Sequence, residues 1–197
     1  MNRLFNYLLL VISVAGFSHS AYAIPIYYTA KLDGPSESPA NVSPGNGFAN
    51  VVIDDTAHTM LVDVTFSGLL GNVTAAHIHG PTGAVGTGNA SVATTTPTFP
   101  GFPAGVTSGS YVNTFDTTLA STYRAGFITD NGGTVALAET ALFSAIADGK
   151  AYLNIHTNQF PGGEIRGFLQ VPEPAITSLM LLGIFGIAFA KRRAAIT

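Results

Sequence analysis

Three of the five histidines in this chain lie in two short segments whose spacing could serve metal chemistry. His77 and His79 are two residues apart in Ala-Ala-His-Ile-His-Gly-Pro, so on an extended strand both side chains point to one face. His156 ends a second alternating segment, Ala-Tyr-Leu-Asn-Ile-His. Adjacent strands lie about 5 Å apart, and neutral imidazoles are ligands for both ions, so three of them on neighbouring strands would suit Cu²⁺ or Zn²⁺.

A structural role is the second interpretation of the same segments. Histidines at strand ends commonly bond to the carbonyls and amides of adjacent loops. In Gly-Glu-Ile-Arg-Gly-Phe-Leu, the alternation places Glu164 and Arg166 on one strand face. Pairing between these two, or with Tyr152 and Asn154 of the preceding segment, would form a fold-defining polar network. We favour this network and keep a copper or zinc site at the histidines as the alternative.

A β-hairpin is predicted to position these side chains. The two alternating segments at 151–156 and 164–169 are separated by the turn formers Asn158, Pro161, Gly162 and Gly163. The segment that holds His77 and His79 must then lie beside this hairpin if the imidazoles are to meet. The site hypothesis depends on that neighbourhood.

The rest of the central region also indicates antiparallel β structure. Further strands are expected at 26–32, 48–53, 59–66 and 110–115, with Met60, Val62, Val64 and Phe66 facing the core. The long Gly-, Thr- and Pro-rich stretch 81–110 is expected to be a loop, with Phe99 and Phe102 packed against the body. Residues 119–128 suit either strand or helix. One helix is expected over 134–147, ended by Asp148 and Gly149.

Charge and cysteine content exclude several classes of function. Between residues 24 and 170, four basic residues stand against ten acidic ones, which gives a net charge of −6. So acidic a domain, without a basic cluster, argues against nucleic-acid binding. The chain has no cysteine, so disulfides and thiolate chemistry are ruled out. No serine lies in a hydrolase motif, and Asp63 and Asp116 have no carboxylate partner at a catalytic spacing, so an enzymatic function is not expected.

The N-terminus has the pattern of a secretory signal peptide. A positive residue, Arg3, precedes the apolar stretch 7–17, and Ala21 and Ala23 provide a small-x-small cleavage site. The apolar stretch is too short for a stable membrane span. Cleavage after Ala23 and export across the inner membrane are the expectation.

Near the C-terminus, a Pro-Glu-Pro motif is followed by the apolar stretch 175–190 and a basic tail, the motif residues being Pro172, Glu173, Pro174, Lys191, Arg192 and Arg193. This arrangement resembles the PEP-CTERM sorting signal of Gram-negative bacteria that produce exopolysaccharide. Basic residues after an apolar span stay cytoplasmic and leave the preceding domain outside. The resemblance implies a transient membrane anchor and processing by an exosortase-type enzyme. A plain single-pass tail anchor is the alternative.

The central region resembles the CHRD domain, the module named after chordin and found in many bacterial secreted proteins. The resemblance rests on Ala-His-Ile-His-Gly-Pro, Ala-Tyr-Leu-Asn-Ile-His-Thr and Phe-Pro-Gly-Gly-Glu-Ile-Arg-Gly in this order, within about residues 27–169. It implies an all-β antiparallel sandwich or barrel of immunoglobulin-like or superoxide-dismutase-like type. The chain therefore divides into a signal peptide at 1–23, a CHRD-like domain at 24–170 and a sorting segment at 171–197.

Two functions remain open on these grounds. The first is a non-enzymatic surface or extracellular-matrix module that binds protein or polysaccharide. The second is a copper- or zinc-binding domain, redox-active in one version, built on the three histidines. Their His-x-His pattern is similar to that of copper/zinc superoxide dismutases, but the cysteine pair and the dense zinc loop of those enzymes are missing here. Dismutase activity is therefore not favoured.

Overall fold

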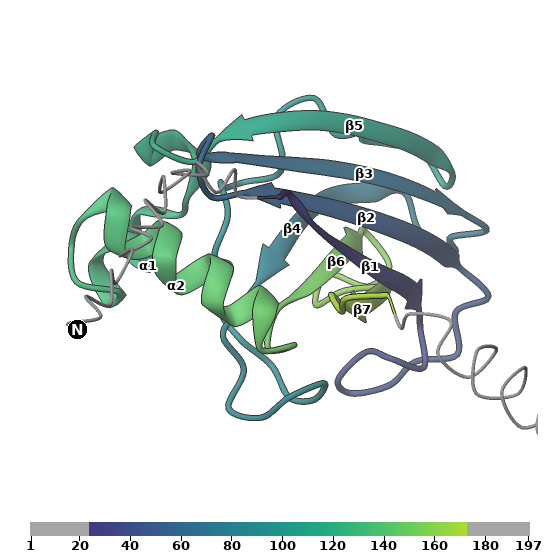
Figure 1. Ribbon diagram of the computed structural model, residues 1–197. Coiled ribbons are helices and arrows are strands. Elements are labelled where there is room, and N and C mark those ends of the chain that lie inside the picture. The colour runs from purple at the N-terminus through teal and green to yellow at the C-terminus, as the bar shows by residue number, and fades with distance from the viewer. Residues whose placement is uncertain (1–23, 173–197) are drawn as a thin grey trace, which may run out of the picture.

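The computed structural model describes residues 24–172, and their core is one seven-stranded antiparallel sheet (Figure 1). The strand order is β4-β6-β7-β1-β2-β3-β5. The strands are β1 (Ile26–Asp33), β2 (Asn46–Asp54), β3 (Thr59–Ser67), β4 (Val73–His79), β5 (Gly109–Asp116), β6 (Tyr152–Thr157) and β7 (Ile165–Phe168). The expectation of an antiparallel, mostly β domain is confirmed.

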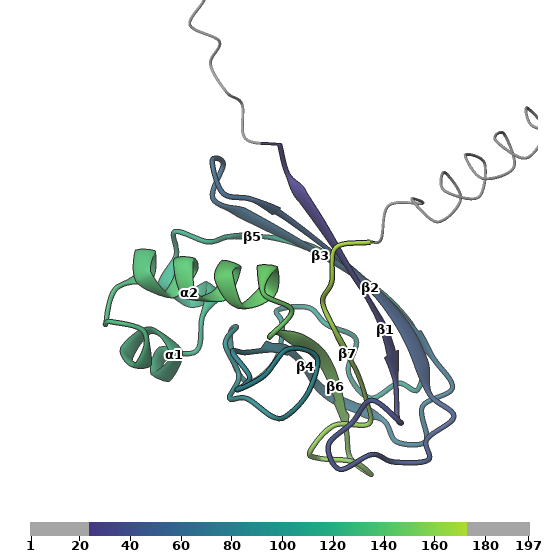
Figure 2. The ribbon, with the colours of Figure 1, turned by 60° about the horizontal axis from the view of Figure 1, so that its bottom comes forward.

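The sheet curls into a half-barrel, so that its two ends face each other across the core (Figure 2). One half is the β1-β2-β3-β5 ladder and the other is β4-β6-β7. The halves join at a narrow seam between β1 and β7, where Asp33 pairs with Arg166 and a bridge links Thr29 to Gln170. The strands thus form one continuous, sandwich-like sheet instead of the two separate sheets of a true sandwich.

The alternation of β3 supplies much of the core. Met60, Val62 and Val64 have no exposed surface and Phe66 is almost fully buried, so the predicted inward face is confirmed. Phe99 and Phe102 of the long loop are also buried, and the two rings pack against Tyr111 of β5. Burial of these aromatic side chains holds the loop against the sheet.

The helical content exceeds the single helix expected from the sequence. The predicted helix is present as α2 (Val135–Ala147), and the Thr134 side chain caps it by accepting from the Leu137 amide. A second helix, α1 (Ala125–Asp130), and a 3₁₀ turn, η1 (Ala120–Thr122), occupy the stretch left open between strand and helix. The expectation of one helix was therefore wrong. Buried Tyr123 and Phe127 stack at 6.3 Å and hold the α1 segment in place.

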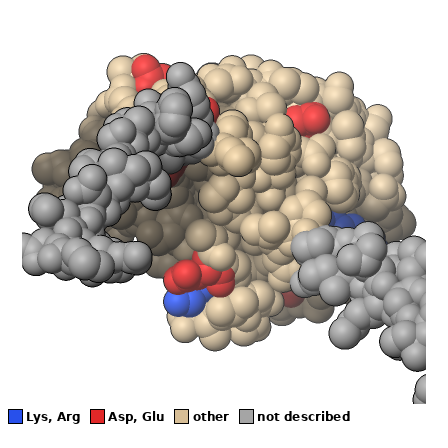
Figure 3. All heavy atoms as spheres, in the orientation of Figure 1, with Lys and Arg blue, Asp and Glu red and all other residues tan. Residues whose placement is uncertain are grey.

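The two ends of the chain fall outside the described residues. The expected signal peptide, with Ala21 and Ala23, lies outside them at one end. At the other end lie most of the sorting motif (Glu173 and Pro174) and the basic residues Lys191, Arg192 and Arg193. Within residues 24–172, no helix is long and apolar enough to cross a membrane. The face shown in Figure 3 is mostly uncharged where the structure describes it, with a few scattered acidic and basic side chains.

Candidate metal centre

Strands β4 and β6 are direct neighbours, so the two histidine-bearing segments lie side by side as predicted. The antiparallel register places His77 opposite Asn154, His79 opposite Tyr152, and Ala75 opposite His156. Residues paired in this way point to the same face of a sheet. The register thus sends all three imidazoles to one side.

The three imidazoles converge on a common point. One ring nitrogen from each of His77, His79 and His156 lies within 4.8 Å of the other two. The Nε2 atoms of His79 and His156 are 3.3 Å apart. His77 and His79 are buried, and His156 is half-buried. Among the His, Cys, Asp and Glu side chains of residues 24–172, these three form the cluster whose spacing could hold a metal ion.

Each imidazole is fixed by a backbone carbonyl from a loop. His77 Nε2 donates to the Pro97 carbonyl at 2.7 Å, because a carbonyl oxygen only accepts. For the same reason His79 Nδ1 donates to the carbonyl of Ala90, and His156 Nδ1 donates to that of Pro161, each at 3.0 Å.

These bonds define the free nitrogen of each neutral ring. The lone pairs are left on His77 Nδ1, His79 Nε2 and His156 Nε2. Such outer hydrogen bonds orient metal-binding histidines in known sites.

The environment keeps the imidazoles neutral. Burial lowers the pKa of His77 to about 4 and that of His79 to about 4. Burial also lowers the pKa of His156. The carbonyl bonds act in the opposite direction but do not outweigh burial. Near pH 7 all three nitrogens therefore carry lone pairs, which is the protonation state that a metal requires.

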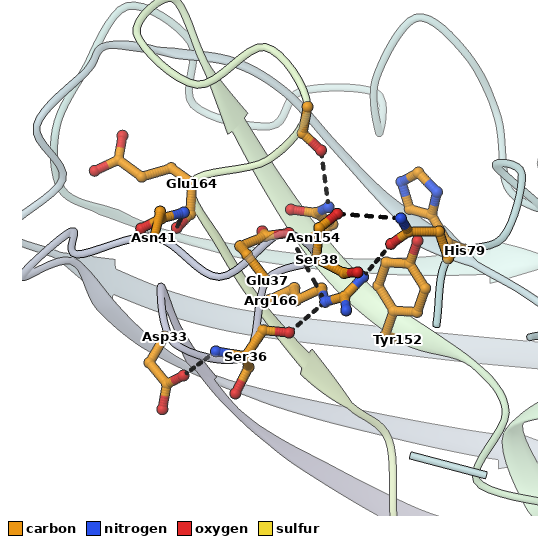
Figure 4. A network of polar contacts seen from close by, with 12 residues as sticks. Asp33, Ser36, Glu37, Ser38, Asn41, His79, Tyr152, Asn154, Glu164 and Arg166 are labelled. Atoms are coloured by element: carbon orange, nitrogen blue, oxygen red, sulfur yellow. Dashed lines mark hydrogen bonds and ion pairs between the residues drawn. The ribbon is translucent and has the colours of Figure 1, made fainter. Parts of the chain in front are cut away.

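Tyr152 of β6 and Arg166 of β7 form a stacked group beside His79 of β4 (Figure 4). The Tyr152 ring lies parallel to the His79 ring, with 4.9 Å between the ring centroids. The Arg166 guanidinium lies over the Tyr152 ring at 4.6 Å from its centroid. Arg166 also donates to the Ser36 carbonyl and to Asn89 Oδ1, so it ties two loops to the sheet. Tyr152 and Arg166 thus form part of the predicted polar network.

Glu164 does not belong to this network, contrary to the predicted face-sharing with Arg166. Its carboxylate points away from Arg166 (Figure 4). It accepts from side-chain hydroxyls and backbone amides, namely Ser43 Oγ, Thr157 Oγ1 and the amides of Leu70 and Gly71. The regular pairing of β7 begins only at Ile165, one residue later, so the alternation does not extend back to Glu164. Burial alone would raise the Glu164 pKa, but these hydrogen bonds outweigh it and lower the pKa.

The residue that pairs with Arg166 is Glu37, which the sequence did not indicate. Arg166 Nε lies 3.8 Å from Glu37 Oε2, and both side chains are almost fully buried. Burial raises the pKa of Glu37 to about 7, and the Arg166 charge only partly opposes this. Glu37 lies in an irregular loop rich in Ser and Pro, where no periodicity marks a buried position.

Three buried side-chain acceptors lack a hydrogen-bond partner in the described part of the chain: Glu37 Oε1, His77 Nδ1 and Asn154 Oδ1. Asn154 is opposite both His77 and Arg166 in the strand register, so these residues share one face. Native proteins leave few buried polar atoms unpaired, and each costs roughly 1–3 kcal/mol. Two of the three atoms, His77 Nδ1 and Asn154 Oδ1, therefore lie unpaired on the face that carries the histidines.

The fold and the site define a small antiparallel half-barrel with an imidazole cluster at one edge of its sheet. The chain belongs to the CHRD domain family, whose model matches residues 28–169. No curated protein and no solved structure matches the chain.

Proposed function

We propose that this CHRD domain binds a transition-metal ion, Cu²⁺ or Zn²⁺, through His77, His79 and His156. The proposal rests on one observation above all. The Nε2 atoms of His79 and His156 face each other at 3.3 Å while the Nδ1–H group of each ring is engaged by a carbonyl. Neither Nε2 can donate to the other in neutral rings, so a metal ion bound between them would make this contact favourable.

Distance and burial support this interpretation. Zinc–imidazole bonds of about 2.0–2.1 Å in a tetrahedral site place the ligand nitrogens roughly 3.3 Å apart. The His79–His156 pair already has this separation. The third nitrogen, His77 Nδ1, is buried and without a partner, and binding the ion would satisfy it.

Calorimetric titration of the full-length chain with Cu²⁺ and with Zn²⁺ tests the proposal. We expect one ion per chain at neutral pH, with the heat lost in His77→Ala and His156→Ala. His58→Ala is the matched control, because His58 lies at the turn between β2 and β3, where it contacts Glu139. Binding that persists in His156→Ala, or no binding by the unmodified chain, would rule out this site.

We also propose that the domain acts as a non-enzymatic module at the cell surface or in an extracellular matrix. The outer face of β1, β2 and β5 carries large exposed apolar side chains, namely Tyr27, Phe48 and Val112. Such side chains support contact with a protein or a neutral polysaccharide. Loss of binding to immobilised polysaccharide in Tyr27→Ser and Phe48→Ser, with the metal site intact, is the expected result. Equal retention of both variants would contradict this role.

We further infer export from the signal-peptide pattern, and sorting from the Pro-Glu-Pro pattern at residues 172–174. In this proposal the apolar C-terminal stretch anchors the protein briefly in the inner membrane of a Gram-negative bacterium until an exosortase-type enzyme removes it. Mass spectrometry of the extracellular protein should show a chain that begins at Ile24 and lacks residues 176–193. An extracellular protein that retains these residues would exclude processing.

A further inference from the structure

The three-histidine site has too few protein ligands to fill the coordination sphere of either ion. In the described chain, the group contains three imidazoles and no carboxylate or thiolate. Zinc takes at least four ligands, and zinc sites with three protein ligands keep a water or substrate in the fourth position. Copper(II) prefers four ligands in a tetragonal arrangement. An ion held here therefore needs at least one ligand from outside the set.

The site is most accessible at His156. His77 and His79 are only 6% and 7% exposed, whereas His156 is half-buried. The loop that follows His156 supplies Pro161, whose carbonyl holds the ring in place. This loop also forms one wall of a groove of about 390 Å³, and residues 37–41 form the opposite wall. The histidines do not line this groove, so the partly exposed His156 ring is the side on which solvent comes nearest to the cluster.

The nearest fixed cation favours a small anion or a polarised water at the open position. Arg166 stacks over Tyr152, which in turn stacks on His79, so a permanent positive charge lies one ring away from a ligand. Glu37, which lies 3.8 Å from the Arg166 guanidinium, partly offsets this charge when ionised.

We propose that the ion bound by His77, His79 and His156 keeps one exchangeable coordination position, open on the His156 side, which takes water or a small monoanion. This inference rests on the metal-binding function proposed above. It distinguishes a centre that can bind an exogenous ligand from a closed structural metal site.

Azide titration of the Cu²⁺-loaded full-length chain, followed by electron paramagnetic resonance and optical absorption, tests the inference. We expect nitrogen hyperfine coupling from the imidazoles before azide is added, and a saturable change of both spectra on addition. Spectra that stay unchanged while copper remains bound would overturn the open position and leave metal binding intact. Failure of the chain to bind Cu²⁺ would overturn both proposals.

Two variants test the charge argument in opposite directions. At pH 8, where Glu37 with its pKa of about 7 is ionised, Arg166→Gln should weaken azide binding and Glu37→Gln should strengthen it, each by about threefold or more, because a nearby unit charge changes the local potential. Copper loading should persist in Glu37→Gln, which keeps the result decisive if Arg166→Gln fails to fold. Equal azide affinity in Glu37→Gln and the unmodified chain would overturn the preference for anions.

Discussion

His79 Nε2 lies 3.3 Å from His156 Nε2, although each ring donates its other nitrogen to a carbonyl and neither free nitrogen can donate. With both rings neutral, this contact sets two lone pairs against each other. Strand pairing tolerates it because the β4–β6 register fixes both backbones. In the metal site that we propose, the ligands are thus already close together, which lowers the cost of ordering them on binding.

Metal binding should therefore stabilise the fold measurably. At a free Zn²⁺ concentration of about 100 times Kd, the free energy of unfolding should rise by about 2.7 kcal/mol through mass action. Thermal unfolding with Zn²⁺, and again after addition of a chelator, measures this change. His156→Ala should show no metal-dependent shift, while His58→Ala should respond like the unmodified chain. An equal shift in all three proteins would indicate binding elsewhere.

The stability of the ion-free protein should fall on acidification. The pKa values of His77 and His79 are about 4 in the folded state because the rings are buried, against about 6.5 in an unfolded chain. Between these values the unfolded chain binds more protons, so stability decreases as the pH falls from about 6.5 towards 4. Each unit of pKa depression corresponds to about 1.4 kcal/mol.

Urea unfolding at a series of pH values measures this dependence. His77→Gln should flatten the slope between pH 6.5 and 4, because glutamine keeps a donor for the Pro97 carbonyl and does not titrate. A slope identical to that of the unmodified protein would contradict a buried neutral His77.

Glu37 should have the opposite pH dependence. Its pKa of about 7 in the folded state lies above the value of about 4.5 expected when unfolded, because burial disfavours the charged carboxylate. The folded state therefore binds more protons between these values, and the contribution of Glu37 to stability is lost as the pH rises through 7. Glu37→Gln should stabilise the protein by about 2 kcal/mol more at pH 8 than at pH 5. A pH-independent effect of this substitution would show that the Arg166 charge compensates the burial of Glu37.

The sequence was sufficient to predict the elements that carry periodic patterns. The alternation in residues 59–66 and in the two histidine segments predicted β3, β4 and β6, and it placed His77 and His79 on one strand face. The meeting with His156 depended on the pairing of β4 with β6, which the structure shows. The Glu37–Arg166 pair joins residues that are distant in the chain, and an irregular loop gives no pattern for such a contact. The position of Glu164 was mispredicted because its strand starts one residue later, which ends the alternation at that point.

Glu164 should be a major determinant of stability because its carboxylate links three separate segments. It accepts from Ser43, from Thr157 and from the consecutive amides of Leu70 and Gly71. Glu164→Gln replaces one acceptor oxygen with a donor that faces amide and hydroxyl donors. We expect a loss of about 2–4 kcal/mol in urea unfolding at pH 7. Asp55→Asn, an exposed turn substitution, should change stability by no more than about 0.5 kcal/mol. Similar effects of the two substitutions would refute the linking role of Glu164.

The seam between the two halves of the sheet should depend on Gly167. A Cβ atom at this position would overlap the backbone carbonyl of Lys31 in β1, and a backbone atom cannot rotate away as a side chain can. Gly167→Ala should therefore separate β7 from β1 locally and cost about 1–3 kcal/mol of stability. Because Arg166 is adjacent, Asn89 and Ser36 should also lose part of their contact with its guanidinium.

Gly162→Ala provides the matched comparison within the same Gly-containing segment. A Cβ atom at Gly162 meets nothing within 4 Å, so this substitution should leave stability within about 0.5 kcal/mol of the unmodified protein. Denaturant unfolding gives the energies, and hydrogen exchange at the Thr29 and Gln170 amides, which pair across the seam, reports its opening. If Gly167→Ala leaves those amides as protected as Gly162→Ala does, the close approach of β7 to β1 does not determine how the half-barrel closes.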